Sequence, residues 1–194
     1  NVLKYGGGPY FDLMNFHFYP LFGLNWTDDP PQDGPGLVEK TAAVRAIMRT
    51  YNVEKPVIIT EAGWHNNPSI PHGDDTLQVR YVQKLYTQAK ASGVSMMAWW
   101  PFSDAGGAYT YNSGLVTSAV GSQAALKPAY FAYVVFAREL AGTTYVAEIQ
   151  ASADSKVYKF QDSAKGRTIY VAWTNPTDMK TVFGSIKYPY QDTT

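Results

Sequence analysis

The residue best placed for chemistry is Glu61, which ends the apolar run Val57–Glu61 and is followed by Ala, Gly and Trp. The run is short and rich in β-branched residues, so it predicts a strand that is buried on both faces. A carboxylate at the tip of such a strand is costly unless hydrogen bonds stabilise it. Two interpretations stay open: Glu61 is a reactive group, or it only caps the following loop.

Two other segments predict strands with functional side chains near their ends. The aromatic stretch Tyr10–Tyr19 alternates so that Asn15, His17 and Tyr19 share one face. The apolar stretch Val94–Trp100 ends in two tryptophans. Because the carboxyl ends of parallel strands meet at one edge, we expect hydrogen-bonding groups, a carboxylate and tryptophans to gather there. Taken alone, His17 also fits a hydrogen-bonded core histidine.

Helices are predicted after each of these strands. The residues Val44, Ile47, Met48 and Tyr51 recur at helical spacing and predict one buried stripe. A second helix should begin near Asp75, with Gln78 completing a capping box, and should end at Ser92-Gly93. The three predicted helices are Leu37–Tyr51, 75–91 and Ala129–Ala141, the last opened by Pro128.

The fold class indicated is α/β, since strand, loop and helix alternate three times over roughly the first 140 residues. The loops after the strands are long, including the Pro- and Gly-rich segment Pro20–Gly36, as on the active face of a (β/α)8 barrel. From Thr143 the pattern changes to short strands. They are predicted at Thr143–Gln150, Ser155–Phe160, Thr168–Trp173 and Lys180–Ser185, with a turn at Asp162–Gly166.

Composition excludes several classes of function. Lys+Arg and Asp+Glu both number 16, so nothing indicates a nucleic-acid or membrane partner. The chain has no Cys, which excludes disulfides, thiolate metal sites and Cys nucleophiles. Aromatic residues make up 15%, which suits a surface that stacks on sugar rings. Glu61, His65 and His72 do not have the spacing of a known metal site, so we expect no metal.

Four motifs in order carry a resemblance to a known family. They are FHFY at 16–19, VIITEAGW at 57–64, AWWPFSD at 98–104 and KPAYFAY at 127–133. The set resembles the last three βα units of clan A retaining glycoside hydrolases, a group of (β/α)8-barrel cellulases, mannanases, xylosidases and relatives. The resemblance covers roughly residues 5 to 142. It implies a partial TIM barrel over 1–142 and a small antiparallel β region over 143–194 that packs on it.

The resemblance implies hydrolysis of a β-linked poly- or oligosaccharide by the retaining mechanism, without a cofactor. Glu61 matches the nucleophile, which would attack the anomeric carbon and form a covalent glycosyl-enzyme. His17 and Tyr19 match the side chains that donate hydrogen bonds to it, with Asn15 beside them on the same face. Trp100 matches the tryptophan that stacks against the reacting sugar, while Trp99 should face the helices.

Two more residues are weaker candidates for substrate binding. Trp64 either lines a neighbouring sugar subsite or only packs its loop. Asp104 either binds a substrate hydroxyl or caps a helix or loop. Acting on a polymer would favour an extracellular or periplasmic location.

The missing second carboxyl group departs from the family pattern. Retaining hydrolysis needs such a group as acid and base. In clan A that group usually follows Asn, after the fourth strand, and this chain has no Asn-Glu dipeptide. Its other Glu residues are Glu39, Glu54, Glu139 and Glu148, none of them placed for this role. The chain also opens at Asn1, so we expect the C-terminal part of a longer enzyme, with five upstream βα units missing.

Three interpretations follow from that departure. The parent protein is a retaining glycosidase, or a carbohydrate-binding protein on the same fold without catalysis, or these residues are an inactive scaffold fragment. Three parallel strands leave two open sheet edges. We therefore expect a partner: a complementary N-terminal half-barrel segment or a second copy of the chain.

Overall fold

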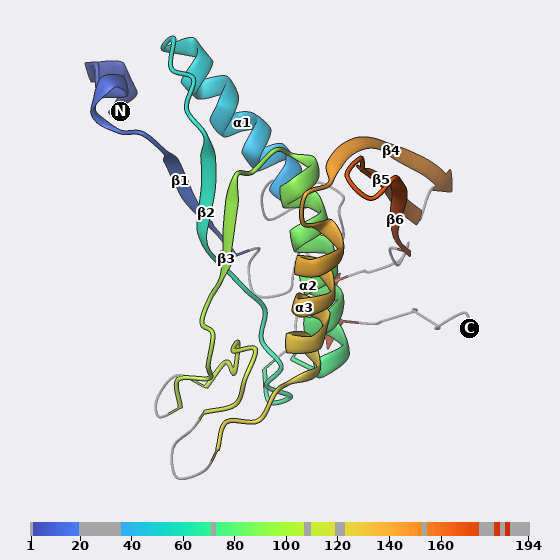
Figure 1. The fold of residues 1–194 in the computed structure, drawn as a ribbon. Helices are drawn as coiled ribbons and strands as arrows, with labels where there is room; N and C mark the ends of the chain where they lie inside the picture. The colour runs from blue at the N-terminus through green and yellow to red at the C-terminus, as the bar shows by residue number, and fades with distance from the viewer. Residues whose placement is uncertain are drawn as a thin grey trace.

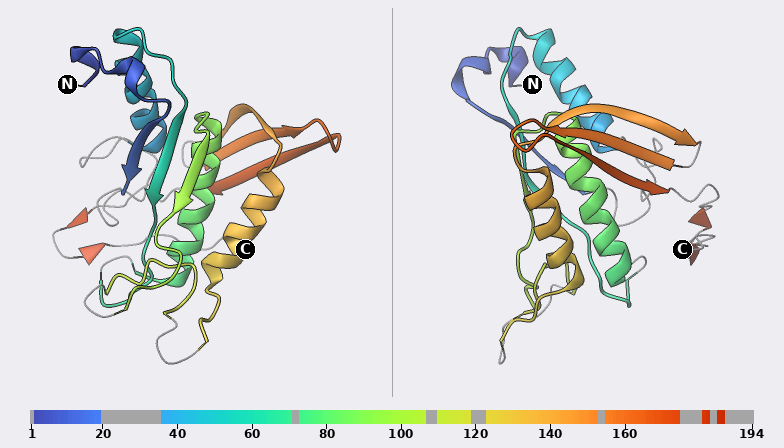
Figure 2. Two further views of the ribbon diagram at one scale, coloured as in Figure 1. Left: turned by 60° about the vertical axis from the view of Figure 1, so that its left-hand side comes forward. Right: turned by 45° about the vertical axis from the view of Figure 1, so that its right-hand side comes forward.

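A three-stranded parallel sheet forms the centre of the molecule (Figure 1). Its strands are β1 (Met14–Phe18), β2 (Val57–Ala62) and β3 (Met96–Trp99), hydrogen-bonded in the order β1-β2-β3. All three point the same way, so their carboxyl ends and the loops that follow lie at one end of the sheet (Figure 2). The mixed α/β organisation predicted from the sequence is confirmed. The computed structural model describes residues 2–19, 36–70, 73–106, 110–118, 123–152, 155–174, 181–182 and 185–186.

Helices α2 and α3 pack together over one face of this sheet, while the opposite face carries more exposed side chains (Figure 1). The main core lies between the sheet and these helices and includes Ile59, Val82, Leu85 and Trp99. No helix within the described residues is long and apolar enough to cross a membrane. The helices are α1 (Leu37–Thr50), α2 (Asp75–Ala91) and α3 (Pro128–Leu140), with 3-10 turns η1 (Leu3–Tyr5) and η2 (Gly8–Tyr10) before β1.

The buried stripe of α1 differs from the predicted one. Met48 is buried and Val44 packs beside it, but Ile47 is 56% exposed and Tyr51 is 40% exposed. The helix also buries Leu37 near its start, as part of the main core. The helical period is right and the phase of the stripe is wrong, because periodicity alone does not fix where a neighbouring element lies.

The start of α2 also differs from the prediction. The N-cap is Asp74, whose Oδ1 accepts the backbone N–H of Leu77 at 2.8 Å. Asp75 instead accepts a hydrogen bond from the amide of Asn66 at 2.7 Å. Gln78 is fully buried and donates to the carbonyl oxygen of Trp64, so it takes no part in a capping box. Two adjacent aspartates give the same capping signal one residue apart, and the structure selects the first.

Three of the C-terminal strands form an antiparallel sheet beside the carboxyl ends of α2 and α3 (Figure 2). Phe160 and Tyr158 are buried against Leu140 of α3, so the sheet and the helices share a second core. The turn predicted at Asp162–Gly166 lies between the second and third strands as expected. The strands of this sheet are β4 (Thr144–Ser152), β5 (Ser155–Asp162) and β6 (Arg167–Thr174), in the order β4-β5-β6. A separate antiparallel pair is formed by β7 (Thr181–Val182) and β8 (Ser185–Ile186).

Two other predicted segments lie partly outside the described residues. The predicted strand Lys180–Ser185 overlaps β7 and the first residue of β8, and its remaining residues lie outside the described ones. Most of the predicted loop Pro20–Gly36 also lies outside them, as does His72. The division of the chain at residue 142 stays a prediction.

Candidate functional site

An irregularity in β2 brings two consecutive side chains to the same face of the sheet. Phe16 pairs with Ile59, but the next residue, His17, pairs with Glu61, so Thr60 is an extra residue in the ladder. Side chains in a regular strand alternate between faces, and a bulge of this kind re-aims them. As a result, Thr60 and Glu61 both contact His17.

The carboxylate of Glu61 contacts His17 of β1 and accepts a hydrogen bond from Tyr19, the residue after that strand. Its Oε2 lies 3.3 Å from Nδ1 of His17 and 3.3 Å from the hydroxyl of Tyr19, which donates to it. The Glu61 side chain is 32% exposed and that of His17 is 48% exposed, so solvent reaches both. The structure thus brings together the carboxylate and both donors that the sequence predicts.

Asn15 lies on the same face but contacts Thr60 rather than Glu61. Its Nδ2 donates to Oγ1 of Thr60 at 2.8 Å, and its Oδ1 accepts the backbone N–H of Thr60 at 3.1 Å. Oγ1 of Thr60 lies 3.1 Å from Nε2 of His17. Asn15 therefore reaches Glu61 only through Thr60 and His17. Sequence reasoning missed Thr60, because regular alternation places it on the face opposite Glu61.

The two tryptophans at the end of β3 take the orientations expected of them. Trp99 is buried against Tyr81 of α2, and its indole N–H donates to the carbonyl oxygen of Ser113 at 2.8 Å. Trp100 is 41% exposed, and its backbone N–H donates to the carbonyl oxygen of Ala62 at 2.9 Å. The backbone of Trp100 is therefore fixed to the strand that carries the carboxylate.

Gly63, two residues after Glu61, is required by this close approach. A Cβ on Gly63 would collide with the carbonyl oxygen of Trp100. The Ala-Gly-Trp sequence after the carboxylate thus has a structural reason, since only glycine lets the two loops meet.

Trp64 requires a correction. Its side chain is only 3% exposed and packs against Tyr81, with ring centroids 4.7 Å apart. A buried indole offers no surface for a sugar ring to stack on. Of the two alternatives for Trp64, packing of its own loop agrees with the structure.

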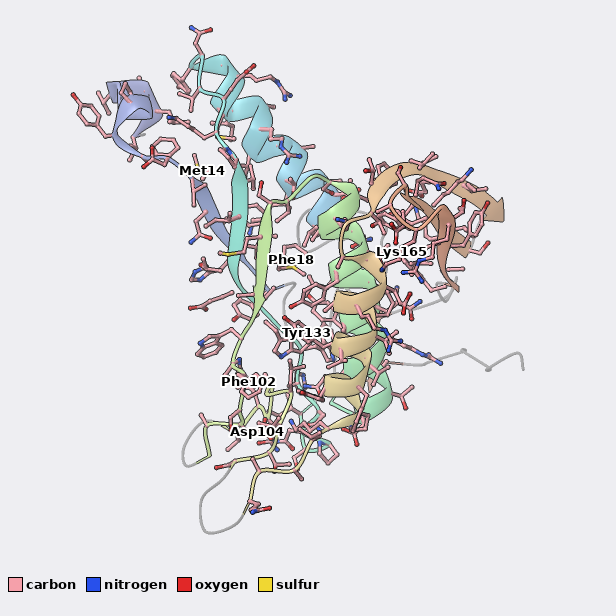
Figure 3. The ribbon with its side chains drawn as sticks, viewed as in Figure 1. Met14, Phe18, Phe102, Asp104, Tyr133 and Lys165 are labelled. Carbon is pink, nitrogen blue, oxygen red and sulfur yellow. The ribbon has the colours of Figure 1, made fainter. Side chains whose placement is uncertain are left out.

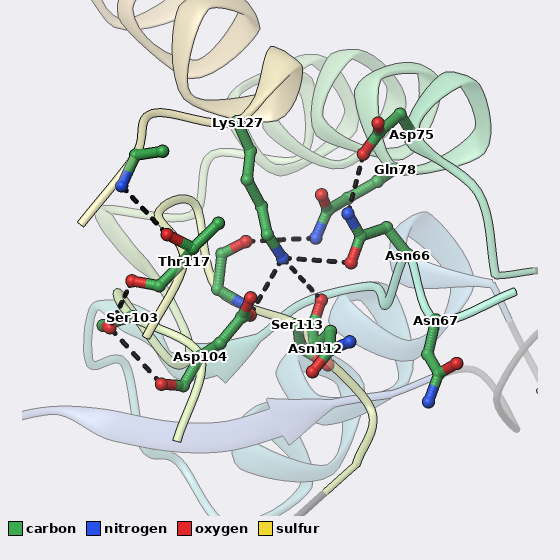
Figure 4. Close-up of polar contacts among 12 residues, drawn as sticks. Asn66, Asn67, Asp75, Gln78, Ser103, Asp104, Asn112, Ser113, Thr117 and Lys127 are labelled. Carbon is green, nitrogen blue, oxygen red and sulfur yellow. Dashed lines mark hydrogen bonds and ion pairs between the residues drawn. The ribbon is translucent and has the colours of Figure 1, made fainter. Parts of the chain in front are cut away.

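Asp104 also requires a correction, because it belongs to a buried polar network (Figure 4). Its Oδ1 accepts Nζ of Lys127 and the backbone N–H of Gly114, both at 2.8 Å. Lys127 is 5% exposed and also donates to Oδ1 of Asn66 at 3.0 Å and to the carbonyl oxygen of Asn112 at 2.8 Å. Asp104 has a structural role here: with Lys127 it joins the loop after β2 to the loop after β3.

The network contains a buried ion pair between Lys127 and Asp104. Burial lowers the pKa of Lys127, while the hydrogen bond and the negative charge of Asp104 act in the opposite direction. Lys127 immediately precedes α3, and Figure 3 shows Asp104 and Phe102 on the loop beyond β3. The network therefore ties the start of α3 to the loops that carry Gly63 and Trp100.

Comparisons with known proteins give one informative match. No protein-family model matches the chain, and none of the curated proteins matches it. The structure is similar to that of a family 39 glycoside hydrolase from the gut symbiont Bacteroides cellulosilyticus WH2, at 24% identity and a TM-score of 0.70. The match covers 98% of this chain and 39% of that one. The chain thus has the fold of part of a glycoside hydrolase.

A second, more distant match is to a glycosylated endo-β-1,4-xylanase of glycoside hydrolase family 10 from Gloeophyllum trabeum. It has 19% identity and a TM-score of 0.45, and covers 70% of this chain and 39% of that one.

Proposed function

We propose that this chain supplies the nucleophile side of a retaining glycosidase active site, in which Glu61 attacks the anomeric carbon of a β-linked sugar. The observation that supports it is the carboxylate of Glu61, which lies 3.3 Å from Nδ1 of His17 and accepts a hydrogen bond from Tyr19 at the carboxyl end of a parallel strand. Donors on one oxygen stabilise the ionised form that a nucleophile needs. The exposed indole of Trp100 follows the neighbouring strand and offers a surface for the sugar ring.

The acid/base carboxyl group belongs to a different segment in this proposal. In retaining enzymes the two carboxyl groups are about 5–5.5 Å apart. The carboxylates on the described loops after β2 and β3 have structural roles: Asp74 caps α2, Asp75 binds Asn66, and Asp104 binds Lys127. This observation also favours the alternative, a carbohydrate-binding protein on the same fold that does not cleave its ligand.

The three βα units correspond in this proposal to the last three of a (β/α)8 barrel. In support, β1 and β3 are the edge strands of the described sheet. Apolar side chains are also exposed on β3 and on α3: Met96 at 50%, Phe131 at 57% and Val135 at 46%. An upstream half-barrel segment, or a second copy of the chain, would cover them. Light scattering over a range of concentrations gives the oligomeric state, and a thermal melt gives the cooperativity of unfolding. A monomer that melts sharply and cooperatively at low concentration argues against this arrangement.

The experiment that tests the function compares Glu61→Gln with Glu54→Gln in the whole protein. Glu54 is an exposed carboxylate in the loop before β2, so its variant is a matched control. We expect Glu61→Gln to abolish turnover of β-linked substrates and to retain binding, since the amide keeps the shape and loses the nucleophile. Glu54→Gln should retain both.

Three results separate the alternatives. Normal turnover by Glu61→Gln would assign the nucleophile to another residue. Sugar binding without turnover in the unchanged protein would favour the non-catalytic alternative, and neither binding nor turnover would favour the scaffold.

A further inference from the structure

Thr60 contacts the imidazole of His17 on the side opposite the Glu61 carboxylate. Oγ1 of Thr60 lies 3.1 Å from Nε2, while Nδ1 lies 3.3 Å from Oε2 of Glu61. Both contacts depend on the extra residue in β2, which points Thr60 and Glu61 toward the same ring.

Asn15 fixes the position of the Thr60 hydroxyl. The backbone N–H of Thr60 can only donate, so the atom of Asn15 that it meets at 3.1 Å is Oδ1. The amide orientation is thereby set, and Nδ2 of Asn15 donates to Oγ1 at 2.8 Å. The hydroxyl proton has two possible acceptors, since Oγ1 also lies 3.1 Å from Oδ1 of Asn15.

We propose that Thr60 is a positioning residue that keeps Nδ1–H of His17 directed at Glu61 in both the neutral and the protonated form of the imidazole. An ionised carboxylate only accepts hydrogen bonds, so the Nδ1 that contacts Glu61 must carry a proton. In neutral His17, Nε2 is then an acceptor and the Thr60 hydroxyl donates to it. In the imidazolium, Nε2–H donates to Oγ1, and the hydroxyl proton turns to Oδ1 of Asn15.

The hydroxyl therefore serves both states by rotation about its C–O bond, with no proton transferred. The hydroxyl of Tyr19 shares Oε2 of Glu61 with this ring. Nζ of Lys40, on α1, donates to the backbone carbonyl of His17 at 3.1 Å and lies over the rings of Phe16 and Phe18. In the described part of the chain, the recorded partner of Nε2 is Thr60. The consequence for catalysis rests on the proposed function, whereas the hydrogen-bond assignment does not.

The test uses 15N-histidine NMR on the whole protein with Thr60→Val and Thr60→Ser. This chain has three His residues, so few imidazole signals come from it, and a His17→Asn variant assigns the one that matters. Thr60→Val replaces the hydroxyl with a methyl group of similar size, and Thr60→Ser keeps the hydroxyl. Dispersed spectra of both variants show that they fold.

We expect neutral His17 to be protonated at Nδ1 in the unchanged protein. In Thr60→Val, Nε2 of the neutral ring loses its hydrogen-bond donor, so the 15N signal of Nε2 should move downfield, toward that of an imidazole nitrogen that accepts no hydrogen bond. Thr60→Ser should keep the Nε2 signal of the unchanged protein. A neutral ring protonated at Nε2, or the same Nε2 signal in Thr60→Val and the unchanged protein, would overturn the proposal.

Turnover measurements separate this proposal from the proposed function. If Thr60 positions His17 in a glycosidase, Thr60→Val lowers kcat more than Thr60→Ser and leaves the substrate Kd nearly unchanged. If the NMR results hold and the unchanged protein hydrolyses nothing, the positioning role stands and the glycosidase proposal fails. If hydrolysis depends on Glu61 and the NMR results do not hold, the glycosidase proposal stands and the role of Thr60 fails.

Discussion

Lys127→Met removes the ammonium group at the centre of the network that joins the loops after β2 and β3. Nζ of Lys127 lies within 3.0 Å of three acceptors, on Asp104, Asn66 and Asn112. Methionine keeps a long apolar side chain but donates no hydrogen bond, so all three acceptors lose a donor. Asp104, which is 9% exposed, then keeps the backbone N–H of Gly114 and loses its cation.

The expected loss of stability follows from this burial. Removing one partner of a buried ion pair costs about 3–5 kcal/mol. A stability of about 5–15 kcal/mol is usual for a domain, so the loss is a large part of the total. We expect about 3 kcal/mol, the lower end of that range, because Asp104 lies near enough to the surface for water to replace part of the lost bonding.

Urea unfolding followed by tryptophan fluorescence measures this loss. Trp99, the last residue of β3, donates to Ser113 in the loop that follows, so one of the five tryptophans of the chain lies beside this network. Lys165→Met is the matched control, because Lys165 is 60% exposed and lies 3.6 Å from Asp162, and it should leave the midpoint unchanged.

A double variant, Lys127→Met with Asp104→Leu, should recover only the part of the stability that is lost by leaving Asp104 as an unpaired buried charge, because Asn66 and Asn112 still lack their donor. Equal midpoints for Lys127→Met and Lys165→Met would refute the conclusion that this network holds the two loops together.

Two other changes have definite expected outcomes. Under the proposed glycosidase function, Trp100→Ala should lower kcat/KM by about tenfold or more through loss of stacking. The exposed Tyr170 lies on β6, so Tyr170→Ala should leave kcat/KM unchanged, and equal values for the two variants would assign stacking to another aromatic residue. Hydrogen bonds from Arg138 and Arg167 lower the pKa of Glu139 from its ordinary 4.5, so this stabilisation is present above about pH 4.5 and is lost as the pH falls through the folded-state value. The Tm of Arg167→Met should therefore be lower than that of the unchanged protein at pH 7, with a smaller difference near pH 3, and a constant difference would contradict this.

Local patterns were enough to predict the main elements and the central side chains of the site. Apolar runs bounded by Pro and Gly give the strands, and helical spacing gives the helices, because each signal depends on nearby residues alone. Alternation along β1 puts His17 and Tyr19 on one face, and parallel strands bring their ends to Glu61. The orientations of Trp99 and Trp100 follow from the same alternation in β3.

Interactions between distant segments account for what those patterns missed. The irregularity at Thr60 depends on how β2 pairs with both neighbouring strands. Simple alternation along the sequence therefore puts the Thr60 side chain on the wrong face. The position of α1 against the sheet set which of its apolar residues are buried, and Ile47 is exposed as a result. Trp64 and Asp104 look like site residues in the sequence, but packing against α2 and a buried lysine 23 residues away engage them instead. Contacts of this kind bring together residues far apart in the chain, and their partners are determined by the three-dimensional packing of the strands and helices.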